Sequence, residues 1–357
     1  MRIGVNALYL IPGGVGGTEI YLRALLAALA AIDPANQYTI FINQETDSAL
    51  VPAAPNFAVS RQSVRATSRP ARILHEQLRL PLSGIDVLFN PGFTAPVFTR
   101  VPQVTVIHDL QHKRHPGHFR WFDLPAWRLL VWAAVHRSTR LIAVSDSTRA
   151  DLLRHYRIPA GKIATISHGV DPRFFSLARR PEPIVLCVST LHPHKNIERL
   201  VRVFTRFHAQ HPDYRLVLAG MRGFHTAAIE AEIAASAASG FITITGWIPR
   251  EELYSWFTRA SIFIYPSTFE GFGMPVIEAL AAGIPTACSG IEPLRSIAGD
   301  AAWTFPPDDE DAMLAALERL ARGDLPPQPG PERAAQFTWE RAARETLAQL
   351  ERAARSA

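Results

Sequence analysis

Two glutamates lie eight residues apart in the stretch "FEGFGMPVIEAL", Phe269 to Leu280. Glu270 follows the apolar run "SIFIYP", and Glu278 lies in an apolar helical pattern that Pro275 is suited to begin. A carboxylate in a first helical turn gains about 0.3–1 kcal/mol, which could explain Glu278 by structure alone. It does not explain Glu270 or the glycines between the two. The spacing indicates acceptors for a hydroxyl-rich ligand, with backbone amides at the helix end for its phosphate.

A possible cation for such a ligand follows another apolar run, in "VSTLHPHKNIERL". Thr190, His194 and Lys195 lie between this predicted strand and the next predicted helix, which Asn196 can help to cap. Lys195 is placed to meet an anion at the strand end. A solvated lysine before a helix is the equally weighted alternative.

A glycine-rich loop follows the first predicted strand, in "IPGGVGGTEI". Glycines let backbone amides approach a phosphate or a sugar at a helix start. The spacing matches neither a dinucleotide fingerprint nor a Walker loop, so a simple turn is the alternative. The glycines are Gly13, Gly14, Gly16 and Gly17.

A histidine ends the apolar run in "VIHDL", Val106 to Leu110. His108 could hydrogen-bond a substrate hydroxyl or carbonyl, and a histidine satisfied inside the core is the alternative of similar weight. The adjoining "HDLQHKRHPGH" is rich in histidine, but its spacing follows no metal-binding pattern. We expect no metal.

Short β-branched runs alternate with helical patterns along the whole chain, which predicts an α/β protein with mostly parallel sheets. A helix is expected over residues 18–32, with Tyr21, Leu22, Leu25, Leu26 and Leu29 on one face. Ser145 is a natural N-cap for a later helix. The pattern restarts after the break at residues 171–183, and a Pro-rich break at 324–331 precedes a last helix.

The chain has 357 residues, about right for two domains, and 48% of them are hydrophobic. Its two cysteines, Cys187 and Cys288, lie in apolar runs and are expected to be buried free thiols. The N-terminus "MRIGVNALYL" indicates a strand rather than a signal peptide, and no run approaches the roughly 20 apolar residues that span a bilayer. We therefore expect a cytoplasmic protein.

Charge is distributed unevenly along the chain. Residues 1–180 carry 21 Lys and Arg against 11 Asp and Glu, a net of +10, whereas residues 181–357 carry 16 against 21, a net of −5. A basic half can serve nucleic acid, an anionic membrane surface or an anionic small molecule. The arginines are scattered without a nucleic-acid-binding motif beside them, so we expect no nucleic-acid partner.

Together these motifs resemble the family 4 retaining glycosyltransferases of the GT-B fold, in particular bacterial mannosyltransferases of surface-polysaccharide assembly. The resemblance covers nearly the whole chain, and the Glu-x7-Glu loop is its most specific part. It rests on the glycine-rich loop, "IHDL", "VSDSTRADL", "HGVD", "PHKN", "GWIPREELYSWFTRASIFIYPSTFEGFGMPVIEALAAGIP" and "AGDAAWTFPP".

The resemblance implies two doubly wound Rossmann-like domains facing a cleft. Residues 1–175 would form the acceptor side, residues 183–330 the nucleotide-sugar side, and residues 331–357 a helix that crosses back. The donor would be a GDP- or UDP-linked sugar, with no other cofactor and no metal, and mannose is favoured. The acceptor would be a glycan or a lipid-linked molecule. A lipid-linked acceptor would bring the protein to the inner face of the cell membrane.

The family also implies roles for individual residues. Glu270 would contact sugar hydroxyls, Glu278 the ribose, Lys195 the diphosphate leaving group and His108 the transferred sugar. The other donor-binding positions would come from the glycine-rich loop, the segment before Lys195, the backbone that frames the base, and the loop between the glutamates: Gly16, Gly17, Thr190, His194, Trp247, Ile248, Gly271, Phe272, Gly273, Met274 and Pro275.

Two segments depart from the family pattern. Ser189 and Thr190 stand where many members carry Gly-Arg, so the usual phosphate-binding arginine is absent, and His194 or Arg222 would have to supply a second cation. Ser296 replaces a common glutamate. Two other readings therefore stay open. One is a sugar-nucleotide 2-epimerase of the same architecture, and the other is a non-catalytic homologue that binds nucleotide sugars.

Overall fold

The computed structural model describes residues 1–14, 16–119 and 121–356. It divides into two compact units, Met1–Gly169 with Thr338–Ala357, and Val170–Phe337. The first unit therefore ends six residues before the expected boundary at residue 175. Residues 331–337, which we assigned to the returning helix, belong to the second unit instead.

The described part of the first unit contains a seven-stranded sheet in the order β3-β2-β1-β4-β5-β6-β7, and every neighbouring pair is parallel. The strand predicted at the N-terminus is confirmed as β1. The edge strand β3, whose side chains are half-buried or exposed, was not predicted. The strands are β1 (Arg2–Asn6), β2 (Gln37–Ile42), β3 (Phe57–Arg61), β4 (Val87–Asn90), β5 (Gln103–Ile107), β6 (Arg140–Ala143) and β7 (Ile163–Thr165).

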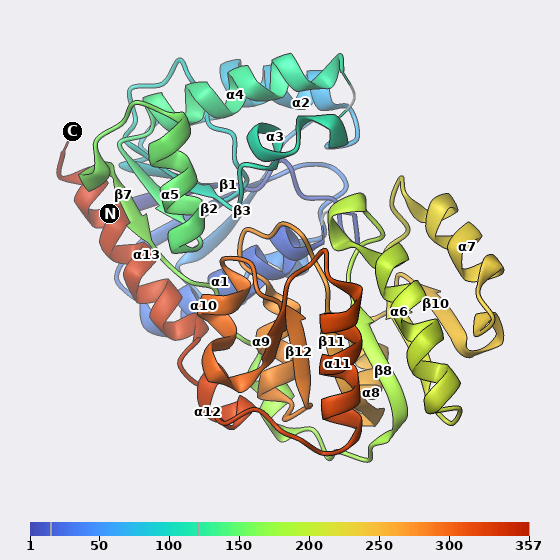
Figure 1. The fold of residues 1–357 in the computed structure, drawn as a ribbon. Helices are drawn as coiled ribbons and strands as arrows, with labels where there is room; N and C mark the ends of the chain where they lie inside the picture. Colours follow the sequence, from blue (N-terminus) through green and yellow to red (C-terminus); the bar gives the residue numbers. More distant parts are fainter. Residues whose placement is uncertain (15, 120, 357) are drawn as a thin grey trace. The chain divides into compact units, whose positions relative to one another are not determined.

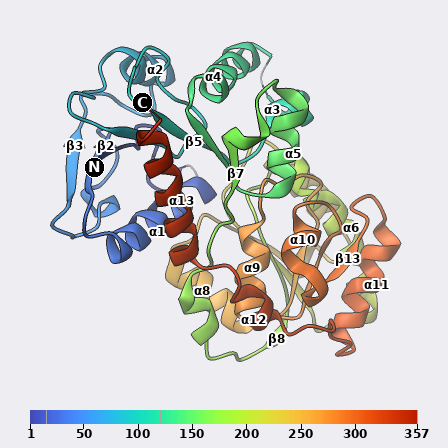
Figure 2. The ribbon, with the colours of Figure 1, turned by 90° about the vertical axis from the view of Figure 1, so that its left-hand side faces the viewer.

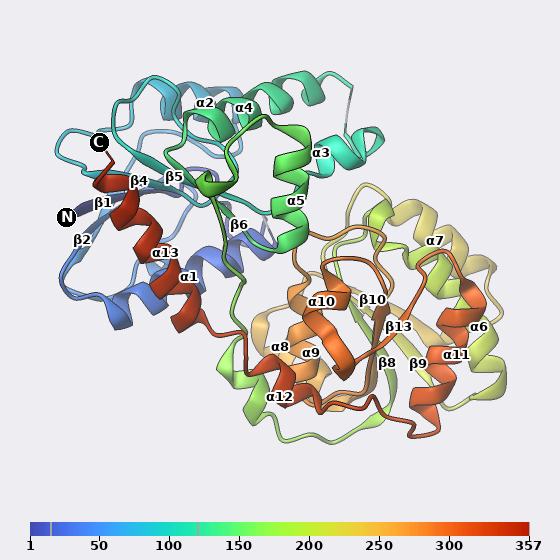
Figure 3. The same cartoon turned by 60° about the vertical axis from the view of Figure 1, so that its left-hand side comes forward.

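Helices cover both faces of this first sheet. The predicted helix is confirmed as α1 (Gly17–Ile32), and the five apolar residues expected on one face are its buried residues. The C-terminal helix α13 (Trp339–Ala354) packs along α1, while α2 (Arg69–Leu78) and α4 (Asp123–Arg137) lie over the opposite face (Figures 1 and 3). The remaining helices of the unit are α3 (Gln111–Arg114) and α5 (Asp146–His155), and Ser145 caps α5 as predicted, accepting a hydrogen bond from the amide of Thr148 at 3.1 Å.

The described residues of the second unit form a six-stranded parallel sheet in the order β10-β9-β8-β11-β12-β13. The sequence analysis did not predict β13, which has only three residues. The strands are β8 (Glu182–Val188), β9 (Arg215–Ala219), β10 (Ile242–Gly246), β11 (Ala260–Tyr265), β12 (Thr286–Ser289) and β13 (Trp303–Phe305).

The helices of the second unit also form two layers. Helices α6 (Ile197–Gln210), α7 (Thr226–Ala235) and α11 (Glu310–Ala321) pack together, and α9 (Met274–Ala281) packs with α10 (Leu294–Ala298) and α12 (Gly330–Ala334). Figure 2 shows α8 (Arg250–Arg259) near α9 and α12. A short 3-10 helix, η4 (Pro172–Ser176), packs on α9 at the start of the unit, and a second, η5 (Pro193–Lys195), precedes α6.

Each sheet has one point at which the strand order reverses direction. In the first sheet it lies between β1 and β4, and in the second it lies between β8 and β11. In open parallel sheets, ligands bind beyond the carboxyl ends of the strands at such a point, because the connections there leave in opposite directions. Ligand sites are therefore expected at the residues after Asn6, Asn90, Val188 and Tyr265.

The two cysteines are buried and free, as predicted. Burial raises the pKa of both thiols to about 12, so neither is a reactive thiolate at neutral pH. Over the described ranges, we find no helix with the length and apolar character needed to cross a bilayer.

Candidate functional site

Lys195 and Glu270 meet at the reversal point of the second sheet. Lys195 ends the short helix after β8, and Glu270 follows β11, the neighbouring strand. The ammonium Nζ of Lys195 donates to Glu270 Oε1 at 2.5 Å and to the hydroxyl oxygen of Tyr265 at 2.9 Å. The two side chains retain only 13% and 11% exposure, so a charged pair lies partly buried where a ligand is expected.

Backbone hydrogen bonds join the loops that carry this pair. The carbonyl oxygen of His194 accepts from the amide of Thr268 at 2.7 Å and from the hydroxyl of Ser267 at 3.0 Å. Asn196 adopts a left-handed conformation with φ 59° and donates to the carbonyl of Pro266 at 3.1 Å. Its side chain does not cap α6, so that part of the prediction is wrong. The result is a rigid connection that fixes Lys195 against Glu270.

The loop after Glu270 requires glycine at residue 273. Gly273 has φ +115°, and a Cβ there would lie 2.3 Å from Leu294 Cδ2. Phe272 anchors the loop by an edge contact with Phe337, with ring centroids 6.0 Å apart. Helix α9 then begins at Met274, so Pro275 is its second residue rather than its first. The N-terminus of α9 thus follows directly from the loop that carries Glu270.

Glu278 lies in the second turn of α9, not in the first turn as predicted. The helix-end charge effect falls off within the first turn, so it does not explain this residue. Its side chain is 7% exposed and accepts from Arg250 Nη2 at 3.0 Å. A buried carboxylate with a dedicated cation is a specific arrangement, because burial without a partner would cost several kcal/mol.

Arg250 also bonds Asp171, next to the start of the unit. Its Nη2 lies 3.3 Å from Asp171 Oδ2, and the hydroxyl of Tyr254 donates to the same oxygen. Burial tends to raise the pKa of Asp171, but bonds from Tyr254 and the Arg173 amide, with the charge of Arg250, outweigh burial and lower it. Burial raises the pKa of Glu278, Arg250 opposes this, and the net pKa stays above the ordinary carboxyl value.

The two glutamates act on a common group. Burial raises the pKa of the Tyr265 hydroxyl well above its usual range, and the charges of Glu270 and Glu278 add to the effect. Lys195 and Glu270 likewise both act on the thiol of Cys187. Tyr265, the last residue of β11, therefore lies within electrostatic reach of both carboxylates, and its hydroxyl oxygen accepts from the Lys195 ammonium, so acceptors and a cation suited to a hydroxyl-rich anionic ligand gather around it.

Arg222, one of the two residues predicted as a second cation, is paired on the surface of the second unit. Arg222 Nη1 lies 2.6 Å from Glu230 Oε1 in a largely exposed ion pair. The His194 ring is near parallel to that of His192, with centroids 5.9 Å apart. Thr190 follows β8 as expected and its carbonyl accepts from the amide of His192 at 2.9 Å.

Trp247 and Ile248 follow β10 directly. The Trp247 side chain is 61% exposed, and Ile248 is half-buried. In the strand order, β10 is separated from β8 by β9, so these residues lie farther along the same edge of the sheet than Lys195 does.

In the first unit, His108 lies near the other reversal point. Its Nε2 bonds the carbonyl oxygen of Pro91, which follows β4, at 2.8 Å. Tyr21 packs on it edge-on at 5.0 Å between centroids, and His168 lies 5.7 Å away. Burial lowers the pKa of His108 to about 4, so the ring is neutral at physiological pH. This geometry satisfies the core-histidine alternative.

The glycine-rich loop leads into α1 as predicted. Gly16 is the N-cap residue with φ +58°, and α1 begins at Gly17. Glu19 Oε2 accepts from the amide of Gly13 at 2.8 Å, and Oε1 accepts from Arg23 at 2.9 Å. One loop amide is thus already held by a carboxylate of the helix itself.

Sequence reasoning missed the partners of Glu278. Arg250 lies in the quoted segment "GWIPREELYSW" and Asp171 in "HGVD", but neither was predicted as a site residue. No periodicity relates residues that are 28 and 79 positions apart from Arg250. The sequence did show a charged residue within or beside each motif. Such a residue can be named as a candidate site residue, but the sequence does not show which one it contacts.

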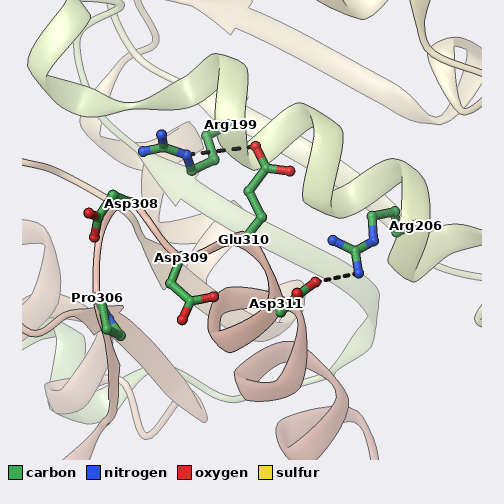
Figure 4. Close-up of a pocket in the computed structure, with 7 residues that line it drawn as sticks. All are labelled: Arg199, Arg206, Pro306, Asp308, Asp309, Glu310 and Asp311. Atoms are coloured by element: carbon green, nitrogen blue, oxygen red, sulfur yellow. Dashed lines mark hydrogen bonds and ion pairs between the residues drawn. The ribbon is translucent and has the colours of Figure 1, made fainter.

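A separate pocket opens between α6 and the start of α11 (Figure 4). Arg199 and Arg206 line one side, and residues 308–311 line the other with acidic side chains. These groups pair with each other, as in Arg206 Nη2 to Asp311 Oδ1 at 2.6 Å. The lining carries four carboxylates against two guanidinium groups, and the pocket is distinct from the Lys195–Glu270 site. Across the described ranges, no group of three or more metal-ligating side chains converges.

Family models match both units. A model described as "Glycosyltransferase Family 4" matches residues 15–174, and one described as "Glycosyl transferases group 1" matches residues 171–337. The two matches run without a break from residue 15 to residue 337. The chain belongs to these glycosyltransferases.

Several relatives are named as mannosyltransferases. O-antigen chain mannosyltransferase B of Escherichia coli is 28% identical over 263 residues, covering 68% of each chain. The MMP alpha-(1->4)-mannosyltransferase of Mycolicibacterium hassiacum is 27% identical over 253 residues, covering 67% of this glycosyltransferase and 60% of the relative. The GDP-mannose:cellobiosyl-diphosphopolyprenol alpha-mannosyltransferase of Komagataeibacter xylinus is 27% identical over 219 residues, covering 58% and 55%.

Solved structures show the fold. A sucrose-phosphate synthase from Thermosynechococcus elongatus superimposes with a TM-score of 0.78 at 22% identity, over 99% of this chain and 98% of that chain. Anabaena Alr3699/HepE in complex with UDP and glucose gives 0.74 at 16% identity, over 98% and 100%. The predicted fold class, two doubly wound α/β domains of the GT-B type, is confirmed.

Proposed function

We propose that this glycosyltransferase transfers a hexose from a nucleoside-diphosphate sugar, with its donor site at the reversal point of the second sheet. The observation that carries the proposal is the partly buried Lys195–Glu270 pair, 2.5 Å apart on neighbouring strand ends. It is supported by the Anabaena relative, whose solved structures hold UDP and UDP-glucose.

The site has the groups that this chemistry requires. Departure of a nucleoside diphosphate leaves negative charge, which an aimed ammonium stabilises in a partly desolvated site. In the proposed mechanism Lys195 provides that charge, and Glu270 accepts hydrogen bonds from the hydroxyls of the transferred sugar. Glu278 would hold the ribose, and the backbone of Gly271–Pro275 would meet the sugar and the diphosphate.

The reaction would proceed with retention of configuration and without a metal. In this scheme the acceptor hydroxyl attacks the face of the sugar that the diphosphate leaves, and a phosphate oxygen takes the hydroxyl proton. The bond from the anomeric carbon to the phosphate oxygen breaks while the new glycosidic bond forms. Glu270 then positions the sugar and does not become a covalent nucleophile.

Mannose carried by GDP is the donor that we favour. The support comes from the names of the relatives, one of which is a GDP-mannose enzyme. Trp247 and Ile248 would frame the base through their backbone, and Thr190 and His194 would line the phosphate side. The acceptor would be a glycan or a lipid-linked molecule on the first unit.

The test is transfer and hydrolysis across a panel of GDP- and UDP-linked hexoses, with polyprenyl-diphosphate sugars as acceptors. We expect turnover of GDP-mannose by the wild type, and a loss of at least about 100-fold in kcat for Lys195→Ala and Glu270→Gln, as for other charge-stabilising groups. Glu252→Gln, on an exposed position of α8, is the matched control and should retain activity.

Two results would overturn the proposal. Unimpaired transfer by both Lys195→Ala and Glu270→Gln would show that these residues do not form the donor site. Tight donor binding by a wild type that turns over no donor with any acceptor would instead indicate a non-catalytic homologue.

A further inference from the structure

An unusual share of large apolar side chains is exposed on one part of the first unit. Phe98 is 79% exposed and Trp121 is 84% exposed, far beyond what packing requires. Single exposed apolar residues are common on protein surfaces, but a group on neighbouring elements indicates an interaction site. The group consists of Leu74 and Leu78 on α2, Phe98, Trp121 and Phe122 in connecting segments, and Leu129 and Trp132 on α4.

Helix α2 buries charged side chains and exposes leucines, which is the reverse of the usual arrangement. Arg72 and Glu76 are buried and pair with each other at 3.4 Å, whereas Leu74 and Leu78, one helical turn apart, are exposed. A helix on a water-facing surface normally buries its leucines and exposes its charges. The leucine face of α2 is therefore arranged for an apolar environment outside the protein.

Helix α4 is apolar on both faces. Val131 and Val135 are buried against the sheet, while Leu129 and Trp132 point outward with 64% and 51% exposure. A helix that is apolar all round is expected inside a core or against a hydrophobic phase, not at a surface that only contacts water.

Hydrogen bonds hold α2 and α4 beside each other. Gln77 of α2 accepts from the amide of Val97 at 2.7 Å, and Arg137 of α4 donates to the carbonyl of Val97 at 3.1 Å. Phe98 comes next in the chain and so emerges between the two helices. Figures 1 and 3 show α2 and α4 together on the face of the sheet opposite α1.

Arginines surround this apolar group. Within α2, residues 91–100 and α4, the exposed charged side chains that the structure describes are all arginines, and Asp123 is half-buried. Arginine side chains can lay their apolar stems along a hydrophobic phase while the guanidinium reaches anionic headgroups, and tryptophan favours the same boundary. The arginines, with Arg79 at the end of α2, are Arg69, Arg79, Arg100, Arg128 and Arg137.

We infer that this surface, formed by α2, Phe98, the 121–122 segment and α4 and called here the α2–α4 surface, binds an anionic lipid bilayer. The inference deepens the proposed use of a lipid-linked acceptor by naming the surface that would meet the bilayer, and its test does not require transfer activity. The apolar side chains insert at headgroup level, and the arginines contact anionic headgroups.

The charge argues for a bilayer over a second copy of the chain. In a twofold dimer the same patch would face itself, so the arginines of one copy would lie near those of the other. Like charges brought together in this way oppose association. An anionic membrane gives the arginines a complementary partner and covers the leucines and tryptophans.

The experiment is co-sedimentation of the full chain with vesicles of phosphatidylcholine alone or with 30 mol% phosphatidylglycerol, a composition chosen to make the surface anionic. We expect binding to the anionic vesicles only. Phe98→Glu and Leu78→Glu should each weaken it roughly tenfold or more, since each removes insertion and adds repulsion. Leu325→Glu, at a 57% exposed leucine of the second unit, is the matched control and should bind as wild type.

Charge is tested separately from apolar insertion. The triple variant Arg69→Gln, Arg79→Gln, Arg128→Gln should bind about 100-fold more weakly, since each cation near an anionic surface contributes about fivefold. Equal binding to both vesicle types, or wild-type binding by Phe98→Glu and by the triple variant, would overturn the inference. A dimer in solution that Phe98→Glu makes monomeric, with no vesicle binding, would identify a second copy as the occupant instead. Donor turnover measured on the same samples shows whether the proposed function survives either result.

Discussion

Replacing Arg250 with methionine tests whether Glu278 is held as a buried anion. The variant keeps most of the side-chain volume but leaves a carboxylate with 7% exposure without its cation. Removing one partner of a buried ion pair costs about 3–5 kcal/mol. Because the Arg250 side chain keeps 30% exposure, we expect the lower end, about 3 kcal/mol near pH 7.5.

The pH dependence of this loss has a definite sign. Burial raises the pKa of Glu278 in the folded state, and Arg250 counteracts part of the rise. A carboxyl with a raised pKa binds more protons when folded, so its penalty is absent at low pH and grows as the pH rises through the folded pKa. Without Arg250, the free-energy cost of keeping the Glu278 carboxyl ionised in the folded state at neutral pH is larger. The loss of free energy caused by Arg250→Met should therefore shrink as the pH is lowered toward 5. In more acidic solution Asp171, which also lies near Glu278, loses part of its charge.

Hydrogen exchange measured by mass spectrometry on peptides from α9 gives the local free energy of opening, which is suitable because the two units need not unfold together. Arg222→Met is the control, since it makes the same substitution in the largely exposed Arg222–Glu230 pair and should cost less than about 1 kcal/mol. A loss below about 0.5 kcal/mol for Arg250→Met at pH 7.5, or a loss that grows on acidification, would refute the reasoning.

Three further predictions concern the first unit. Because burial lowers the pKa of His108 to about 4, stability should fall as the pH drops from 6.5 to 4, and His108→Gln should reduce that fall in thermal melts. Gly169→Ala should destabilise by about 2 kcal/mol or more, because its Cβ would meet the backbone nitrogen of Trp339 at 2.2 Å, whereas Gly161→Ala, whose added Cβ has no heavy atom within 4 Å, should be neutral in the same melts. Thr338→Ala should cost about 1 kcal/mol by removing the side-chain cap of α13, and Thr338→Ser should retain the stability.

The strands and helices with strong internal patterns were predictable from the sequence. The buried face of α1 follows from residues spaced at helical intervals, and the cap of α5 follows from a serine before an acidic first turn. The exposed edge strand β3 and the three-residue β13 lack the apolar run that marks a buried strand. Sequence patterns therefore predict those helices and strands whose burial is visible in the spacing of their own residues.

The partners within the site were less accessible to sequence reasoning. Glu270 and Lys195 could be named because each follows an apolar strand. Their contact depends on β8 and β11 being neighbours, which sheet order decides. Arg250 joins Glu278 to Asp171 across three separate elements. Long-range pairs of this kind leave no periodic signal, although their members lie beside recognisable motifs.

The central claim is that Lys195 and Glu270 form a nucleotide-sugar site in the second unit. Isothermal titration of the full chain with GDP and with GDP-mannose, beside UDP and UDP-glucose, tests it most directly. We predict that the wild type binds the preferred nucleotide and that Lys195→Ala weakens binding of the diphosphate and of the sugar nucleotide alike. Glu270→Gln should weaken binding of the sugar nucleotide more than binding of the free diphosphate, because contacts to the sugar hydroxyls are lost while the glutamine oxygen can still accept from Lys195. Binding of GDP-mannose and UDP-glucose that neither variant changes would contradict the account.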